Sequence, residues 1–143
     1  MARANILVDS SFWIAFYTPE ENERHQRAME IIEYLENNEV IIPWPTLYEF
    51  INTRLARRKE NLYSFEQFIL KPNVKKLPDE EYKELALQNV FKLNTSRHAS
   101  ISLVDEVLRQ MILDHKLKID YLATFNKSDF EHSCQVARVL IFE

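Results

Sequence analysis

Short apolar blocks alternate along the chain with longer stretches in which apolar residues recur every three or four positions. The blocks are typical of strands buried on both faces of a sheet. Periodic stretches of the second kind predict amphipathic helices. Because the two kinds alternate, the pattern predicts an α/β domain built around a mainly parallel sheet. The predicted strands cover residues 6–8, 40–42, 74–77, 121–123 and 139–141.

The helices are predicted from apolar spacing and from residues that start or stop helices. One follows Ser10 and Ser11, and another begins near Pro43 and Pro45, because proline suits a first turn. The latter carries Glu49. Further helices are predicted over residues 25–35, 65–69, 79–93 and 102–114.

Length and composition indicate a folded protein of one domain, spanning residues 1–143. The chain is 46% hydrophobic and 28% charged, which lies outside the range of disordered sequences. No apolar run reaches the roughly 20 residues of a membrane helix, and no signal peptide is recognised. A single cysteine, Cys134, cannot form an internal disulfide, so we expect a cytoplasmic protein with no membrane partner.

The sequence contains no glycine. Phosphate-binding P-loops, dinucleotide-binding turns and nucleophile elbows all need residues without a Cβ atom, so none of them can be built here. A catalytic site in this protein must therefore be formed by side chains.

Four acidic residues are candidates for such a site. Asp9 directly follows the first strand, and Asp129 lies in the turn after the fourth. Glu49 and Asp105 lie near the starts of two helices that follow strands. Ligands of open α/β sheets bind beyond the carboxyl ends of the strands, where all four carboxylates can meet.

Four carboxylates in one place repel one another, so some would stay protonated unless a cation is bound. Oxygen ligands without cysteine or paired histidine favour Mg²⁺ or Mn²⁺ over zinc. One or two such ions can activate water and stabilise the displacement at a phosphodiester.

At these positions the sequence resembles the PIN-domain family of metal-dependent ribonucleases, which includes the toxins of VapBC-type toxin–antitoxin systems. The matching segments are ILVDSSFWIA with Asp9, TLYEF with Glu49, SLVDEVL with Asp105 and LATFNKSDF with Asp129. The resemblance implies an α/β/α sandwich of three layers and a Mg²⁺- or Mn²⁺-dependent endoribonuclease. It also implies that these four residues are both the metal ligands and the catalytic residues.

Polar residues beside the four acids are expected to support them. Ser10 and Ser102 match polar positions of the family and can orient water or a carboxylate, and Thr124 is placed with them. Asn126 stands where many members of the family have an aspartate. Within the site, Asp9 and Asp105 are expected to hold the metal ion, Glu49 to polarise the attacking water, and Asp129 to complete the site.

Simpler interpretations remain for each acid taken alone. Asp105 can serve as a partner of the helix dipole, Asp129 as a turn residue before a short helix, and Glu49 as part of a solvated helix face. A phosphotransferase with a nucleophilic aspartate is a weaker alternative, because Ser11 stands where the haloacid-dehalogenase pattern requires a second aspartate. A catalytically weak PIN-like scaffold that binds RNA or protein is the remaining alternative.

Substrate and partner predictions rest on charge and aromatic content. The net charge is −4, but Arg54, Arg57 and Arg58 are spaced to form a ridge on the helix of Glu49, suited either to RNA phosphates or to solvent. Aromatic residues make up 12% of the chain, and several, including Trp13 and Phe16, lie in a helix that no later segment obviously covers. We expect about half of these side chains to lie in the core and the others to form an exposed apolar patch that binds a second copy of the chain or an antitoxin protein.

Overall fold

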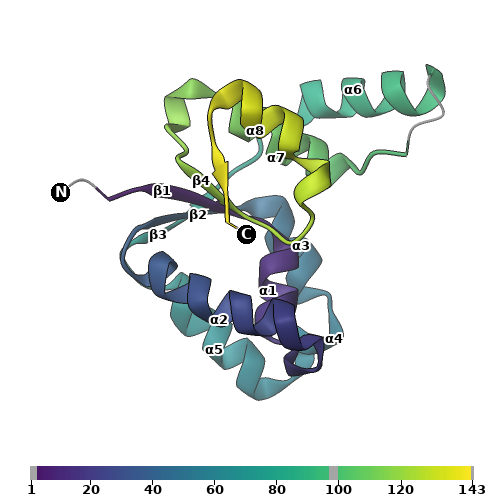
Figure 1. Cartoon of the computed structure of the whole chain (residues 1–143). Coiled ribbons are helices and arrows are strands. Elements are labelled where there is room, and N and C mark those ends of the chain that lie inside the picture. Colours follow the sequence, from purple (N-terminus) through teal and green to yellow (C-terminus); the bar gives the residue numbers. More distant parts are fainter. Residues whose placement is uncertain (1–2, 97–99, 143) are drawn as a thin grey trace.

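A five-stranded, entirely parallel sheet forms the centre of the computed structural model, which describes residues 3–96 and 100–142 (Figure 1). The strand order is β3-β2-β1-β4-β5, so the first strand of the chain occupies the middle. This arrangement confirms the prediction of an α/β fold with a parallel sheet. The strands are β1 (Asn5–Val8), β2 (Glu39–Pro43), β3 (Val74–Leu77), β4 (Tyr121–Ala123) and β5 (Leu140–Ile141).

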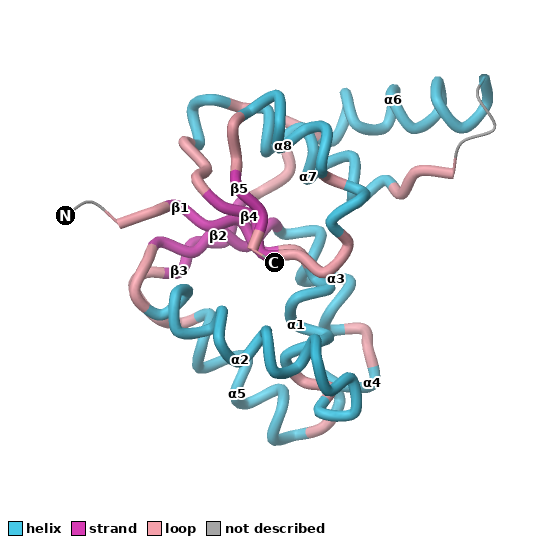
Figure 2. Tube along the Cα trace, viewed as in Figure 1, coloured by secondary structure: helices cyan, strands magenta, loops and turns pink. Residues whose placement is uncertain are grey.

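Helices cover both faces of this sheet and complete the predicted three-layer sandwich (Figure 2). One layer contains α1 (Ser10–Phe16), α2 (Asn22–Glu36), α3 (Trp44–Ile51), α4 (Arg54–Arg57) and α5 (Lys59–Ile69). The other contains α6 (Lys83–Ser96), α7 (Leu103–Leu113) and α8 (Glu131–Ala137). Short 3₁₀ turns η1 (Pro19–Glu21), η2 (His115–Leu117) and η3 (Lys127–Asp129) join these elements. None of the helices in the described parts of the chain has the length and apolar character to cross a membrane.

Alternate side chains of each central strand enter opposite layers. Ile6 and Val8 of β1 are buried against α1 and α2, whereas Leu7 between them packs with residues of α7 and α8. Both faces are therefore apolar, which explains why the strands appear in the sequence as uninterrupted apolar blocks. Cys134 of α8 is also buried in the second layer.

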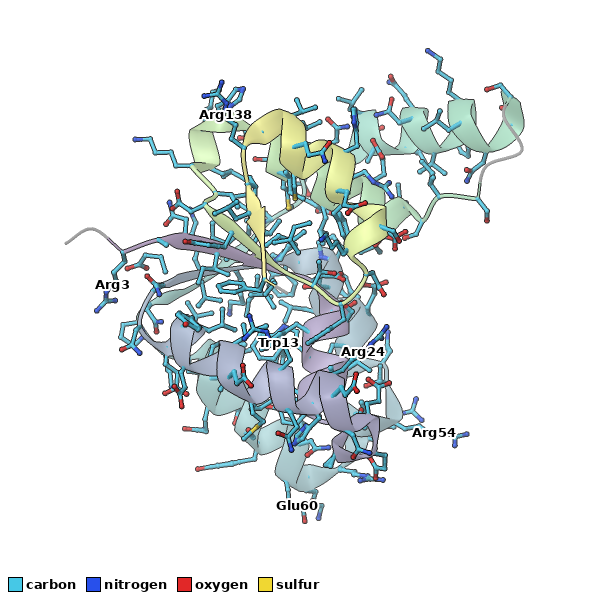
Figure 3. All side chains as sticks on the ribbon, in the orientation of Figure 1. Arg3, Trp13, Arg24, Arg54, Glu60 and Arg138 are labelled. Carbon is cyan, nitrogen blue, oxygen red and sulfur yellow. The ribbon has the colours of Figure 1, made fainter. Side chains whose placement is uncertain are left out.

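The aromatic residues of α1 lie in the core. Trp13 is 1% exposed, and its ring contacts those of Phe65 and Phe68 edge to face at centroid distances of 5.0 and 5.1 Å (Figure 3). Phe12 is fully buried, and Phe16 is half-buried. The expectation that this helix is uncovered was wrong, because α2, α3 and α5 enclose it.

Several helix boundaries also differ from the prediction. The helix of Glu49 ends at Ile51, and a separate short helix begins after Thr53, whose hydroxyl oxygen accepts a hydrogen bond from the Ala56 amide at 3.4 Å. Helix α5 begins six residues earlier than predicted, and α6 begins at Lys83 rather than near residue 79. Helix α8 was foreseen only in the alternative interpretation of Asp129 as a turn residue before a short helix.

Among residues 3–96 and 100–142, three residues adopt the positive φ angles that glycine usually occupies. Lys118 ends η2 with φ 52°, and Arg138 ends α8 with φ 59°, both in the left-handed region. Asn22, with φ 24°, lies at the junction of η1 and α2. In the absence of glycine, larger residues make these bends.

Candidate active site

Asp9 follows the central strand β1 at the carboxyl edge of the sheet, and only 2% of it is exposed. A buried carboxylate is costly unless it accepts hydrogen bonds or binds a cation. The Asp9 Oδ2 atom accepts two hydrogen bonds, from Ser11 Oγ at 2.7 Å and from Thr124 Oγ1 at 2.9 Å. These two hydroxyl groups hold the carboxylate in one orientation.

The same two hydroxyl groups also hold the turn that follows β4. Ser11 Oγ accepts a hydrogen bond from the Phe125 amide at 2.9 Å, and Thr124 Oγ1 accepts one from the Asn126 amide at 3.0 Å. Asp9, α1 and the turn after β4 are therefore joined in one network. Asn126 takes part through its main chain, and its side chain is exposed.

Ser11 is a site residue that the sequence reasoning missed. Both serines were considered as helix starts, but only Ser10 was expected to lie beside the acidic residues. The available signal was a hydroxyl side chain two residues after a buried aspartate, a spacing at which it can reach back to the carboxylate.

Glu49 is brought to the same edge by α3, which begins directly after β2. Its Oε1 atom accepts a hydrogen bond from Ser10 Oγ at 2.8 Å, so Ser10 contacts one of the four carboxylates. Glu49 lies at the exposed rim of the site, yet partial burial of its carboxylate raises its pKa. The Ser10 hydrogen bond opposes this increase, and the charge of Asp9 adds to it.

Asp105 lies in the first turn of α7, where the Ser102 hydroxyl accepts a hydrogen bond from its amide at 3.1 Å and caps the helix. Burial raises the pKa of Asp105 to about 6, and the charges of Asp9, Asp129 and Glu49 contribute to the increase. The other three predicted carboxylates therefore lie near enough to Asp105 for their charges to act on it. Ser102 is thus close to the site but is engaged as a helix cap.

Asp129 ends the 3₁₀ turn η3 and is exposed to solvent. Its main-chain carbonyl accepts a hydrogen bond from Arg109 Nε at 2.9 Å. Arg109, four residues after Asp105 on α7, is a second residue that the sequence reasoning missed. Its positive charge opposes the increase in the pKa of Asp105.

The predicted arginine ridge does not lie on the helix of Glu49, so this premise of the prediction was wrong. Arg54 and Arg57 belong to α4, and Arg58 connects α4 to α5. All three are exposed, and Arg54 points away from the body of the protein (Figure 3). Within residues 3–96 and 100–142, no hydrogen bond or ion pair joins them to the four carboxylates.

The ligand chemistry of the site fits a hard divalent cation. The four carboxylates supply oxygen atoms only, and they are close enough to raise the pKa of Asp105 through their charges. Across the part of the chain that the structure describes, no three histidine, cysteine, aspartate or glutamate side chains are arranged closely enough to hold one ion. The arrangement is therefore an open acidic cluster rather than a closed set of ligands.

Comparisons with known proteins agree with this fold. The sequence model of the PIN domain matches residues 6–133. No curated protein matches the sequence.

The fold is similar to three solved structures. VapC20 of Mycobacterium tuberculosis, described as a sarcin-ricin loop cleaving toxin, has a TM-score of 0.65 and 20% identity, over 89% of this chain and 94% of that one. VapBC2 of Rickettsia felis, bound to a DNA fragment from its promoter, has a TM-score of 0.62 and 12% identity. The match covers 97% of this chain and 99% of that one. FitAcB of Neisseria gonorrhoeae has a TM-score of 0.60 and 18% identity, over 96% of each chain.

Proposed function

The chain belongs to the PIN domain family, and on this basis we propose that it is a Mg²⁺- or Mn²⁺-dependent endoribonuclease. One observation carries the proposal: β1, α3, α7 and η3 bring Asp9, Glu49, Asp105 and Asp129 to one edge of the sheet, where the charges of the other three add to the effect of burial and raise the pKa of Asp105. A divalent cation bound among these carboxylates would offset their repulsion and stabilise the folded state.

Asp9 and Asp105 are the proposed principal metal ligands. Asp9 is buried and oriented by two hydroxyl groups, which leaves its Oδ1 atom available at the edge of the sheet. Asp105 is held by the capped start of α7. Asp129 completes the site from the turn after β4. When bound, the cation would supply charge stabilisation at the phosphodiester and lower the pKa of a water molecule.

Glu49 is the proposed proton acceptor. Its raised pKa makes it a stronger base than an ordinary surface glutamate, and Ser10 fixes the direction of one of its oxygen atoms. Glu49 is therefore suited to accept a proton from the water that attacks phosphorus. Attack by water leaves a 5′-phosphate on one product and a 3′-hydroxyl on the other.

RNA is the proposed substrate, in single-stranded or structured form. Arg54, Arg57 and Arg58 supply three exposed positive charges in one short segment, which can attract the phosphate backbone without reading its sequence. The single cysteine, Cys134, and this substrate are consistent with action in the cytoplasm.

We also propose protein partners for this chain. VapBC-type systems pair a toxin with an antitoxin, and this chain is similar in fold to VapBC2 and FitAcB over almost its full length. An antitoxin partner and a homodimer are therefore proposed here. Light scattering of the purified chain, alone and with the product of an adjacent reading frame, tests both.

The test of the proposed activity uses the purified full chain, single-stranded RNA with a labelled 5′ end, and Mn²⁺ or EDTA. Cleavage is expected with Mn²⁺ only, and Asp9→Asn and Asp105→Asn should abolish it. Asp114→Asn is the matched control, because Asp114 caps the opposite end of α7, and this variant should cleave normally. Cleavage in EDTA, or full activity of Asp9→Asn, would refute the proposal. RNA binding without cleavage would instead support the scaffold alternative.

A further inference from the structure

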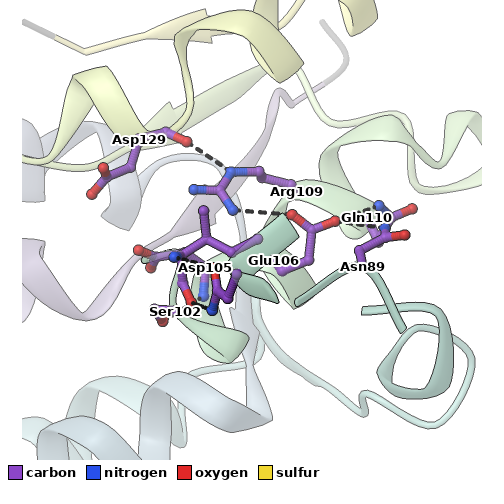
Figure 4. A network of polar contacts seen from close by, with 9 residues as sticks. Asn89, Ser102, Asp105, Glu106, Arg109, Gln110 and Asp129 are labelled. Atoms are coloured by element: carbon purple, nitrogen blue, oxygen red, sulfur yellow. Dashed lines mark hydrogen bonds and ion pairs between the residues drawn. The ribbon is translucent and has the colours of Figure 1, made fainter. Parts of the chain in front are cut away.

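A second acidic residue of α7, Glu106, is buried beside the four carboxylates but faces away from them. It is 6% exposed, and both of its carboxylate oxygens accept hydrogen bonds (Figure 4). Oε2 accepts from Asn89 Nδ2 of α6 and from Gln110 Nε2, each at 2.9 Å. Oε1 accepts from Arg109 at 3.0 Å. A buried carboxylate that accepts hydrogen bonds from three donors is held in a fixed position.

Arg109 connects this carboxylate to the turn that carries Asp129. One of its terminal nitrogens contacts Glu106, and its Nε atom donates to the Asp129 carbonyl at 2.9 Å. The guanidinium group also lies over the ring of Phe130, 5.7 Å from its centroid. Only 17% of the arginine side chain is exposed, so neighbours on several sides restrict it.

The turn that Arg109 holds is short. Within it, the Asp129 amide donates to the Asn126 carbonyl and the Phe130 amide to the Lys127 carbonyl, both at 3.0 Å. These bonds shape the turn but do not fix its distance from α7. Ser11 and Thr124 hold the start of this segment at Phe125 and Asn126, whereas the hydrogen bond from Arg109 links its end, at Asp129, directly to the helix of Asp105.

We propose that Arg109, anchored by Glu106, is the positioning residue that holds Asp129 within reach of the metal bound by Asp9 and Asp105. The inference rests on the proposed function, because it assumes that Asp129 is a metal ligand. Arginine is required for geometric reasons: its planar group donates in two fixed directions at once, toward a carboxylate and toward a carbonyl. Lysine has one terminal nitrogen and cannot keep both contacts in this geometry.

The test is a double-mutant cycle on Mn²⁺ affinity, measured on the full chain from the electron paramagnetic resonance signal of free Mn²⁺. Arg109→Lys keeps the charge and should weaken Mn²⁺ binding by roughly tenfold. This factor is the lower end of the range that is typical when a residue that orients a metal ligand is replaced. In an Asp129→Asn background, Arg109→Lys should cause no further loss, because the residue it positions is no longer a ligand. Glu106→Gln, which weakens the anchor, should lower affinity in the same direction by a smaller factor.

Arg27→Lys is the matched control, because Arg27 forms an ion pair with Glu30 at the same spacing of three residues on α2. It should leave Mn²⁺ affinity unchanged. The positioning role would be overturned if Arg109→Lys binds Mn²⁺ like the wild type, or if its effect is equally large in the Asp129→Asn background. A wild-type chain that neither binds Mn²⁺ nor cleaves RNA would overturn the proposed function itself, and this role with it.

Discussion

Replacing Asp105 by asparagine should stabilise the metal-free protein. The folded state raises the pKa of Asp105 from 3.8 to about 6, so it favours the neutral carboxyl group over the charged one. This difference of about 2 in pKa corresponds to a loss of roughly 3 kcal/mol in the free energy of unfolding when solvent does not screen the charges. The side chain is half-buried and solvent reaches it, so we take about half of this value, roughly 1 to 2 kcal/mol. Asparagine has nearly the same shape and no charge, and it removes this cost.

The sign and the pH range follow from the two pKa values. Below about pH 4, Asp105 is protonated and uncharged in both the folded and the unfolded state, so it does not lower the stability. Between pH 4 and 6 the unfolded state loses the proton first, so stability falls as the pH rises. Above pH 6 the full cost is present. The advantage of Asp105→Asn should therefore be largest above pH 6 and should shrink as the pH falls toward 4.

The assay is thermal unfolding in EDTA at several pH values between 4.5 and 8, followed by circular dichroism. At pH 7.5, Asp105→Asn should melt about 3 to 6 °C higher than the wild type. Adding Mg²⁺ should raise the melting temperature of the wild type more than that of the variant, because binding to the folded state stabilises it.

Asp114 provides a control of opposite sign on the same helix. The hydroxyl group of Tyr82 donates to Asp114 Oδ2 at 2.6 Å and lowers the pKa of this aspartate. Its charge therefore stabilises the folded state above the unfolded pKa, and Asp114→Asn should melt lower than the wild type at pH 7.5. A variant Asp105→Asn that melts lower in EDTA, or whose advantage is the same at all pH values, would refute the charge-repulsion argument.

Three further predictions follow from the contacts described above. Thr124→Val removes a hydroxyl group that donates to Asp9 and accepts from the Asn126 amide. The free energy of unfolding, measured in urea, should fall by about 2 kcal/mol, and an unchanged midpoint would contradict this. Replacing Arg54, Arg57 and Arg58 together by glutamine should weaken RNA binding and flatten its dependence on salt while Mn²⁺ affinity stays constant; an unaltered salt slope would assign these arginines to solvation. Trp13→Ala should lower the free energy of unfolding by about 3 to 5 kcal/mol in urea titrations, because the ring is fully buried, and a loss below 1 kcal/mol would return Trp13 to the surface.

The sheet and the acidic cluster were predictable because each depends on a local signal. A charged residue directly after a buried apolar strand, as at Asp9, identifies both the strand and its carboxyl end. The order of the other acids relative to the predicted strands and helices then brings them to the same edge. Local signals also sufficed for the centre of the parallel sheet, since β1, β2 and β4 are apolar on both faces.

The missed features depend on tertiary contacts or on weak local signals. Arg109 connects α7 to the turn of Asp129, and the spacing of apolar residues along the sequence cannot predict such a contact. The break between α3 and α4 is made by the cap of Thr53 alone, without a proline or glycine to mark it. The sequence left Trp13 open between core and interface, because a count of aromatic residues does not reveal which later helix covers them.

The left-handed bends at Lys118 and Arg138 also have a consequence for the unfolded chain. Average composition would supply about ten glycines to a chain of this length, and each is a point of high backbone entropy when unfolded. Without them the unfolded ensemble is narrower, which favours folding by about 0.4 to 1 kcal/mol at each compatible position. At the positions where φ is positive, a residue other than glycine instead lowers the stability of the folded state by about 1 to 2 kcal/mol. The protein thus concentrates its conformational strain at a few surface bends and gains a stiffer chain everywhere else.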